Sequence, residues 1–222
     1  MRIKKNIITV AIDSPAAAGA GTQSKYIAKE YNLQYLDTGK IYRYIGYLKL
    51  NNVKKFNYSF VRKKIRKIKI ENLKNKKLLS DRVAISASII AKDKQIRKLV
   101  KFFQINCAYN PPSKFSGSVL DGRDITSVIM KDAMFKFFIT ANLKVRAKRR
   151  HLEFKKLKKK ITFNEVLKSL KNRDYLDRNR KYSPLKKTKD SILINTSKLS
   201  KKASFIKIKA IIDKKLKING NL

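Results

Sequence analysis

The most constraining feature of this chain is an apolar segment near its start that passes directly into a loop of small residues and then into an amphipathic segment. The apolar run consists of Ile7, Ile8, Val10, Ala11 and Ile12. Such a run is typical of a β-strand that is buried on both faces of a parallel sheet. The loop reads DSPAAAGAGT, and a helical pattern covers residues 22–31. The order strand, loop, helix favours an α/β fold with a helix N-terminus at the end of its first strand.

The loop partly matches the phosphate-binding pattern G-x-x-x-x-G-K-[ST]. Ser14 stands at the first glycine and Ala20 at the lysine. Gly19 and Gly21 still allow positive φ and a close approach of the backbone to a ligand. Thr22 is placed to offer its hydroxyl to Mg²⁺ at the start of the helix. Taken alone, the loop is equally consistent with an ordinary strand-to-helix turn.

The charge of the chain is strongly positive. Its 222 residues include 56 Lys and Arg but only 15 Asp and Glu, which gives a net charge of +41. This balance normally suggests a nucleic-acid partner. The basic residues are nevertheless spread along the chain and accompany abundant Ile and Asn, which a bias toward A/T-rich codons also produces. We therefore expect no nucleic-acid partner, although a polyanionic substrate is attracted at long range.

The remaining composition indicates a cytoplasmic protein. The start of the chain lacks the pattern of a signal peptide, and no run approaches the roughly 18 apolar residues needed to cross a membrane. The only cysteine, Cys107, lies among apolar residues and is expected in the core. His151, the only histidine, is expected to be exposed or to pack, because one histidine and one cysteine do not support a metal site.

Strand and helix patterns alternate along the chain. Strands are expected at residues 7–12, 34–36, 118–120, 135–139 and 191–194. Helices are expected at residues 22–31, 40–50, 81–108 in two pieces, 142–157, 162–172 and 200–217. This alternation predicts a five-stranded parallel sheet with helices on both faces. Ligands of such sheets bind beyond the carboxyl ends of the strands.

Two charged motifs follow predicted strands. In the first, Thr38 leads into a helix and Arg43 lies one turn further on, which suits an anion site or an N-cap with a surface arginine. In the second, DGRD at residues 121–124, an arginine between two carboxylates suits a phosphate and metal site or a salt-bridged loop.

Two basic segments follow the fourth predicted strand. Arg146, Arg149 and Arg150 are neighbours on one helix, which suits either a lid over a triphosphate or a solvated basic face. Further on, Arg173, Asp177 and Arg180 share a helical face. A carboxylate between two arginines suits a ribose hydroxyl beside a phosphate.

In this order, the motifs resemble those of bacterial cytidylate kinases, which belong to the nucleoside monophosphate kinase group of P-loop kinases. The resemblance runs from about Ile7 to Leu185 and rests on DTGKIYR, VAISAS, DGRD, RAKRR and RDYLDRNRKYSPL. It implies one α/β kinase domain over residues 1–222, with a reduced acceptor-binding insert at about 47–80 and a lid at about 146–180. It also implies a monomer that uses ATP and Mg²⁺ to phosphorylate CMP or dCMP.

The resemblance also implies roles for individual residues. The acceptor phosphate is expected at Thr38, Arg43, Arg123 and Arg180, the ribose at Arg173 and Asp177, and the cytosine near Asp124. The ATP phosphates are expected on the loop of Ala16, Ala17, Ala18, Gly19, Ala20, Gly21 and Thr22, with Thr22 on the metal. The expected catalytic residues are Arg123, Lys40, Arg146 and Arg150.

Two departures from the family bear on activity. Ala20 removes the loop lysine, and Lys40 or a lid arginine is the expected substitute. In the insert, Leu79 stands where relatives carry an arginine, and Arg82 is a possible replacement. Loss of hydrogen-bonding groups weakens discrimination between bases, so CMP, dCMP and UMP could all be accepted. The alternatives are a P-loop kinase with another acceptor, such as UMP or shikimate, and a pseudokinase that binds nucleotide or RNA without phosphoryl transfer.

Overall fold

The computed structural model describes residues 7–218, and its centre is a five-stranded parallel sheet. The strands are β1 (Ile8–Asp13), β2 (Leu33–Asp37), β3 (Gly117–Gly122), β4 (Phe135–Thr140) and β5 (Ile192–Asn195). Their order is β2-β3-β1-β4-β5, and every pairing is parallel. The apolar strand β1 lies in the middle of the sheet, as its sequence predicts. The expected fold class is confirmed.

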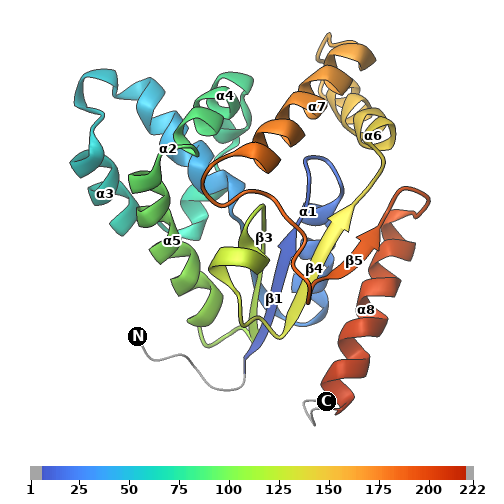
Figure 1. The fold of residues 1–222 in the computed structure, drawn as a ribbon. Helices are drawn as coiled ribbons and strands as arrows, with labels where there is room; N and C mark the ends of the chain where they lie inside the picture. Colours follow the sequence, from blue (N-terminus) through green and yellow to red (C-terminus); the bar gives the residue numbers. More distant parts are fainter. Residues whose placement is uncertain (1–6, 219–222) are drawn as a thin grey trace.

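Helices cover both faces of the sheet (Figure 1). They are α1 (Ala20–Glu30), α2 (Gly39–Asn51), α3 (Tyr58–Arg66), α4 (Asp81–Ile90), α5 (Lys94–Tyr109), α6 (Leu143–Lys156), α7 (Phe163–Asn179) and α8 (Lys201–Ile218). Short 3₁₀ turns are η1 (Val53–Lys55), η2 (Ile70–Lys74) and η3 (Lys76–Leu79), and η4 (Ile125–Ile129) is a π-helical turn. None of the helices in residues 7–218 has the length and apolar character that a membrane span requires.

Alternating residues of β1 face two separate cores. Ala11 packs into a core that includes side chains of α2, α3 and α5. Val10 and Ile12 pack into a second core with α1 and α8. Cys107 is buried in the first core, where loss of hydration raises the pKa of its thiol to about 12. Because both faces of β1 are apolar and covered, the loop that follows it starts from a rigid strand.

The segment between α2 and α4 is helical, although the sequence analysis predicted no helix within it. Val61 and Ile65 of α3 are buried, and Asn57 caps the helix by accepting a hydrogen bond from the Phe60 N–H at 2.9 Å. These two apolar residues are one helical turn apart, and the pattern is hard to detect in the sequence because lysine and arginine fill most of the other positions of α3. This segment lies on one side of the sheet with α2 and α5, while α6 and α7 lie beyond its carboxyl end (Figure 1).

The last two helices before β5 meet the loop that follows β1. Ala16 of that loop packs with Ala147 of α6 and with Val166 and Leu170 of α7. A capping box at Thr162 and Glu165 starts α7. The predicted end of this helix at residue 172 was too early, because α7 continues to Asn179. The longer helix carries Arg173 and Asp177 to the carboxyl end of the sheet.

Candidate functional site

A cavity of about 330 Å³ opens beyond the carboxyl ends of β2 and β3. It is bounded by the start of α2, the region between α4 and α5, the turn after β3, and α7. Of the described residues, six arginines and five acidic residues line it: Arg43, Arg97, Arg123, Arg150, Arg173 and Arg180, with Asp37, Asp121, Asp124, Glu153 and Asp177. The cavity has space for a nucleotide-sized ligand. Its surplus of guanidinium groups favours an anion.

The turns after β2 and β3 are joined by hydrogen bonds. The Thr38 hydroxyl donates a hydrogen bond to the Asp121 carbonyl oxygen at 2.7 Å, and the Thr38 N–H donates to the same oxygen at 3.1 Å. A Cβ on Gly122 would lie 2.5 Å from the Thr38 hydroxyl, so only glycine fits this close approach. The expected substrate residues Thr38 and Arg123 are thereby brought to one wall of the cavity.

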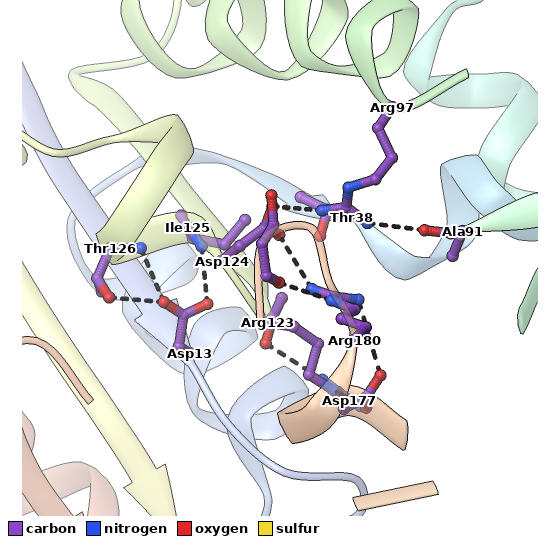
Figure 2. Close-up of polar contacts among 12 residues, drawn as sticks. Asp13, Thr38, Ala91, Arg97, Arg123, Asp124, Ile125, Thr126, Asp177 and Arg180 are labelled. Carbon is purple, nitrogen blue, oxygen red and sulfur yellow. Dashed lines mark hydrogen bonds and ion pairs between the residues drawn. The ribbon is translucent and has the colours of Figure 1, made fainter. Parts of the chain in front are cut away.

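Asp13 at the end of β1 holds the other side of the turn after β3 (Figure 2). Its carboxylate accepts hydrogen bonds from the Ile125 N–H at 2.8 Å, the Thr126 N–H at 2.8 Å and the Thr126 hydroxyl at 2.6 Å. Burial raises the Asp13 pKa to about 6, although these hydrogen bonds act to lower it. The bonds stabilise the π-helical turn η4, which follows Asp124 directly.

Arginines and carboxylates of α7 and the turn after β3 meet in the cavity (Figure 2). Arg123 Nε donates to Asp177 Oδ2 at 2.7 Å. Arg180 Nε donates to the Ser183 carbonyl oxygen at 2.6 Å, whereas its Nη1 is 3.8 Å from Asp177 and its buried Nη2, 3.9 Å from Asp124, has no hydrogen-bond partner. Loss of hydration and the charge of Arg97 lower the Arg180 pKa. An anion in the cavity would satisfy Nη2 and relieve this repulsion.

Arg173 completes the group from one turn earlier in α7. Its side chain reaches the open part of the cavity, where surrounding protein and the charge of Arg123 lower its pKa to about 10. It therefore remains a cation at neutral pH. The structure brings together Arg43, Arg123, Asp124, Arg173, Asp177 and Arg180 with Thr38, all of which the sequence predicts as substrate residues.

Arg97 is a charged member of the cavity that the sequence analysis did not identify. Its Nη2 donates to Asp124 Oδ2 at 2.5 Å, its Nη1 donates to the Ala91 carbonyl at 3.1 Å, and its guanidinium lies 5.6 Å from the centre of the Tyr42 ring. The sequence feature that could have identified Arg97 is its position on the apolar, buried face of α5, one turn before Val100. A buried arginine requires a carboxylate partner, and Asp124 supplies it.

The loop before α1 presents backbone N–H groups instead of a side-chain cation. Gly19 has φ 97° and Ala17 has φ 59°, and no side chain caps the helix. Within residues 7–218, the N–H groups of Ala17, Gly19, Ala20 and Gly21 donate to no protein acceptor. Ala16 and Ala17 line the cavity, whereas residues 18–22 do not. Free N–H groups at a helix N-terminus suit an anion such as a phosphate.

The residues beside this loop fit Mg²⁺ only when phosphate oxygens complete the set. Asp121 is 8% exposed and accepts a hydrogen bond from the Tyr35 hydroxyl at 2.9 Å. A Cβ on Gly21 would lie 3.4 Å from Asp121 Oδ2, so this carboxylate lies against the first turn of α1, beside Thr22. Residues 7–218 hold no cluster of three acidic, histidine or cysteine side chains that could hold a metal alone. Mg²⁺ commonly takes one or two protein oxygens together with substrate phosphates.

Burial and the neighbouring Asp37 raise the pKa of Asp121 to about 7. The positive charge of Arg123 and the hydrogen bond from the Tyr35 hydroxyl act in the opposite direction and only partly offset these two effects. A divalent cation beside Asp121 would favour the ionised form.

The other expected catalytic residues occupy different surroundings. Arg150 lines the cavity, bonds Glu153 at 2.9 Å and stacks over the Phe154 ring at 4.4 Å. Arg146 is 5% exposed and does not line the cavity, and Lys40 is half-buried in the first turn of α2, also outside the lining.

Three further residues discussed in the sequence analysis are Arg43, Arg82 and His151. Arg43 donates to the Leu78 carbonyl at 2.9 Å, immediately before the exposed Leu79. Arg82 is exposed and does not line the cavity. His151 is half-buried and packs edge-on against Phe163, so it packs as expected.

Comparison with known proteins places the chain in a family. The cytidylate kinase family model matches residues 10–214. The chain is 39% identical over 218 residues to the cytidylate kinase of Clostridium botulinum strain Hall, covering 93% of this chain and 98% of that protein. It is 40% identical over 201 residues to the cytidylate kinase of Fusobacterium nucleatum subsp. nucleatum, covering 87% and 91%.

The crystal structure of an uncharacterized protein from Eubacterium ventriosum has the same fold. The TM-score is 0.55 at 18% identity, with 93% of this chain and 98% of that chain covered. The sequence matches extend over most of the chain. The chain belongs to the cytidylate kinase family.

Proposed function

We propose that this protein transfers the γ-phosphoryl group of ATP to CMP or dCMP, giving CDP or dCDP. The observation that carries the proposal is the buried Nη2 of Arg180, which has no hydrogen-bond partner and lies in a cavity with five further arginines. A buried guanidinium nitrogen without a hydrogen-bond partner, in a site where arginines outnumber acidic residues, calls for an anionic ligand. Family membership supports a nucleoside monophosphate as that ligand.

The acceptor lies along the cavity from the turn after β3 to α5. Thr38, Arg43, Arg123 and Arg180 hold its phosphate, because they converge from three elements on one wall. Asp177 and Arg173 of α7 hold the ribose. Asp124 and Arg97 form the end of the cavity that receives the cytosine base. There, the paired carboxylate and guanidinium offer both a hydrogen-bond acceptor and a donor to the edge of the cytosine.

The donor phosphates lie on the loop over residues 16–22, at the N–H groups of Ala17, Gly19, Ala20 and Gly21 that have no protein acceptor. Thr22 and Asp121 are the protein oxygens that fit Mg²⁺. When bound, Mg²⁺ supplies charge neutralisation on the phosphate oxygens. Arg123 and Arg150, which line the cavity, and Lys40 in the first turn of α2 supply the remaining positive charge.

The chemical step depends on position and charge rather than on a proton relay. Phosphoryl transfer requires the attacking phosphate oxygen, the phosphorus and the leaving oxygen in line, with positive charge spread around the transferred group. The acceptor arginines fix one phosphate, and the loop backbone fixes the other. The lid over residues 146–180 is proposed to exclude water, and the insert over residues 47–80 to cover the acceptor, within a single monomeric domain over residues 1–222.

The test is ADP formation by purified protein with MgATP and each of CMP, dCMP, UMP, AMP and shikimate, at low and moderate salt. Transfer to CMP and dCMP in preference to UMP is the expected result. Equal transfer to UMP would show that the site, with Leu79 in place of the arginine of relatives, does not distinguish cytosine from uracil. Nucleotide binding without transfer to any acceptor would overturn the proposal and favour a pseudokinase.

A further inference from the structure

The loop between β1 and α1 is held from behind by side chains that do not line the cavity. Arg146 Nη1 donates a hydrogen bond to the carbonyl oxygen of Ala16 at 2.9 Å. The Thr196 hydroxyl has two carbonyl oxygens within reach of its single proton, that of Thr140 at 3.3 Å and the nearer one of Ala18 at 3.1 Å, to which it donates. Arg146 belongs to α6, and Thr196 directly follows β5. Two elements that are distant in sequence therefore reach the same loop.

Both donors are fixed by further bonds. Arg146 Nε donates to the Ala141 carbonyl at 2.9 Å, and its Nη2 pairs with Asp174 at 2.6 Å. The Thr196 hydroxyl accepts from Arg149 Nη1 at 3.0 Å, and Arg149 Nη2 donates to the Thr196 carbonyl at 2.7 Å. Arg146 is 5% exposed and Thr196 is 3% exposed. Neither group is available to turn toward a ligand without losing several bonds.

These two bonds determine where the loop's N–H groups point. In a trans peptide the C=O and N–H bonds point in opposite directions, and the described chain has no cis peptide. With the carbonyls of Ala16 and Ala18 turned toward the two donors, the N–H groups of Ala17 and Gly19 point to the opposite side. Both N–H groups lack a protein acceptor, as described above.

The conformation of Ala17 requires such support. Its φ of 59° lies in the left-handed region, where a residue with a Cβ is strained unless its surroundings hold it. The carbonyl bonds on either side of Ala17 provide this hold. A lysine at position 20 would add a mobile cation to the phosphates, but Ala20 leaves the backbone N–H groups as the loop's own phosphate ligands.

We propose that Arg146 and Thr196, the latter held by Arg149, are positioning residues that preorganise this backbone for the phosphates of ATP. Their role replaces part of the contribution of the missing lysine, because N–H groups that are already oriented need no reorganisation when the phosphates bind. The inference rests on the proposed function for the identity of the donor. It assigns Arg146 and Arg149 to the back of the loop rather than to the triphosphate.

The test compares Thr196→Val with Thr196→Ser. The two variants differ chiefly in the hydroxyl donor, which serine keeps and valine lacks. We expect Thr196→Val to weaken MgATP binding and raise the KM for ATP about five- to tenfold, the usual scale for losing one hydrogen bond. Thr196→Ser should restore both values, while the KM for CMP changes by less than about twofold in either variant.

Arg146→Gln provides an independent measurement, since it removes a charged donor from the Ala16 carbonyl. The expected loss of MgATP affinity is about ten- to fiftyfold, because the lost bond is charge-assisted. Melting temperatures of all variants separate this effect from general destabilisation. Unchanged MgATP affinity in Thr196→Val and Arg146→Gln would overturn the inference, as would parallel losses for ATP and CMP.

Binding is measured by titration calorimetry with MgATP alone, without an acceptor. If the wild-type protein binds MgATP but transfers no phosphate to CMP, the proposed function fails while the calorimetric comparison still decides the role of Arg146 and Thr196. If the wild-type protein does not bind MgATP, the positioning role is refuted as well.

Discussion

The donor and acceptor halves of the proposed site differ in how they carry positive charge. The acceptor half uses side chains, with Arg43, Arg123 and Arg180 converging on one cavity. The donor half uses the backbone, because Ala20 supplies no charge and four N–H groups of the loop are free of protein acceptors. The comparison teaches that a loop without the lysine side chain can still offer backbone N–H groups to an anion. An arginine cluster has no such substitute, since its charges are the side chains themselves.

The difference also appears in what stabilises each half. Arg123 and Asp177 hold each other at 2.7 Å across the acceptor cavity, so a ligand has to compete with an existing ion pair. In the donor loop, the bonds from Arg146 and Thr196 lie behind the backbone and do not compete with the ligand. We therefore expect substitutions in the acceptor half to act on substrate contacts directly, and those in the donor half to act through backbone geometry.

The largest effect is expected from Arg180→Gln. This variant removes the guanidinium whose Nη2 has no partner and is proposed to bind the acceptor phosphate. A charge-assisted bidentate contact and its transition-state contribution together correspond to a loss of about 10²- to 10³-fold in kcat/KM for CMP. The KM for ATP should stay near the wild-type value in steady-state assays.

Arg178→Gln is the matched control for Arg180→Gln, because Arg178 lies two residues earlier, in the last turn of α7, and is exposed. Its kinetics should equal those of the wild type. Equal losses in the two variants would show that the effect is nonspecific charge attraction, and the distinction between the two halves would then collapse.

A smaller effect is expected from Lys40→Ala. Lys40 is half-buried in the first turn of α2, next to Thr38, and is proposed to supply charge that the loop lacks. Its removal should lower kcat by about tenfold or more, the scale of one preorganised charge. Lys25→Ala, which changes an exposed lysine of α1, should leave kcat unchanged. Equally small effects in both variants would leave the cavity arginines as the only compensating side chains.

The smallest effect is on stability and concerns Asp121→Asn. The folded protein raises the pKa of this carboxyl from 3.8 to about 7, so its contribution to stability is fully present below pH 4 and is lost as the pH rises toward 7. Asparagine cannot ionise, so the variant does not lose this stability as the pH rises. The melting temperature of the variant minus that of the wild type should be greater at pH 8 than at pH 5, by about 3 to 6 °C. A difference that does not change with pH would contradict the raised pKa.

The sequence predicted the sheet and most of the charged residues that line the cavity, because both leave local patterns. Each strand is short and apolar, and each motif follows a strand, so parallel order brings the motifs to one edge. Helix α3 escaped prediction because only Val61 and Ile65 mark its buried face among many basic residues. The π-helical turn after Asp124 has no local pattern of its own and depends on Asp13, which lies more than a hundred residues earlier.

The roles of the lid arginines could not be read from spacing alone. Helical periodicity places Arg146, Arg149 and Arg150 together but does not say which of them faces the cavity. The structure separates them, because packing of Ala147 against Ala16 turns Arg146 inward and leaves Arg150 at the cavity. Arg97 was likewise missed, since its partner Asp124 comes from another element.

The most direct test of the central claim is the rate of phosphoryl transfer to CMP in a single turnover by the wild-type protein and by Ala20→Lys. A preorganised backbone with a complete acceptor half predicts measurable transfer in the wild type and, at most, about a tenfold gain from the lysine. Transfer by Ala20→Lys with none by the wild type would contradict the account. It would show that the donor half requires the lysine and that the natural chain only binds nucleotides.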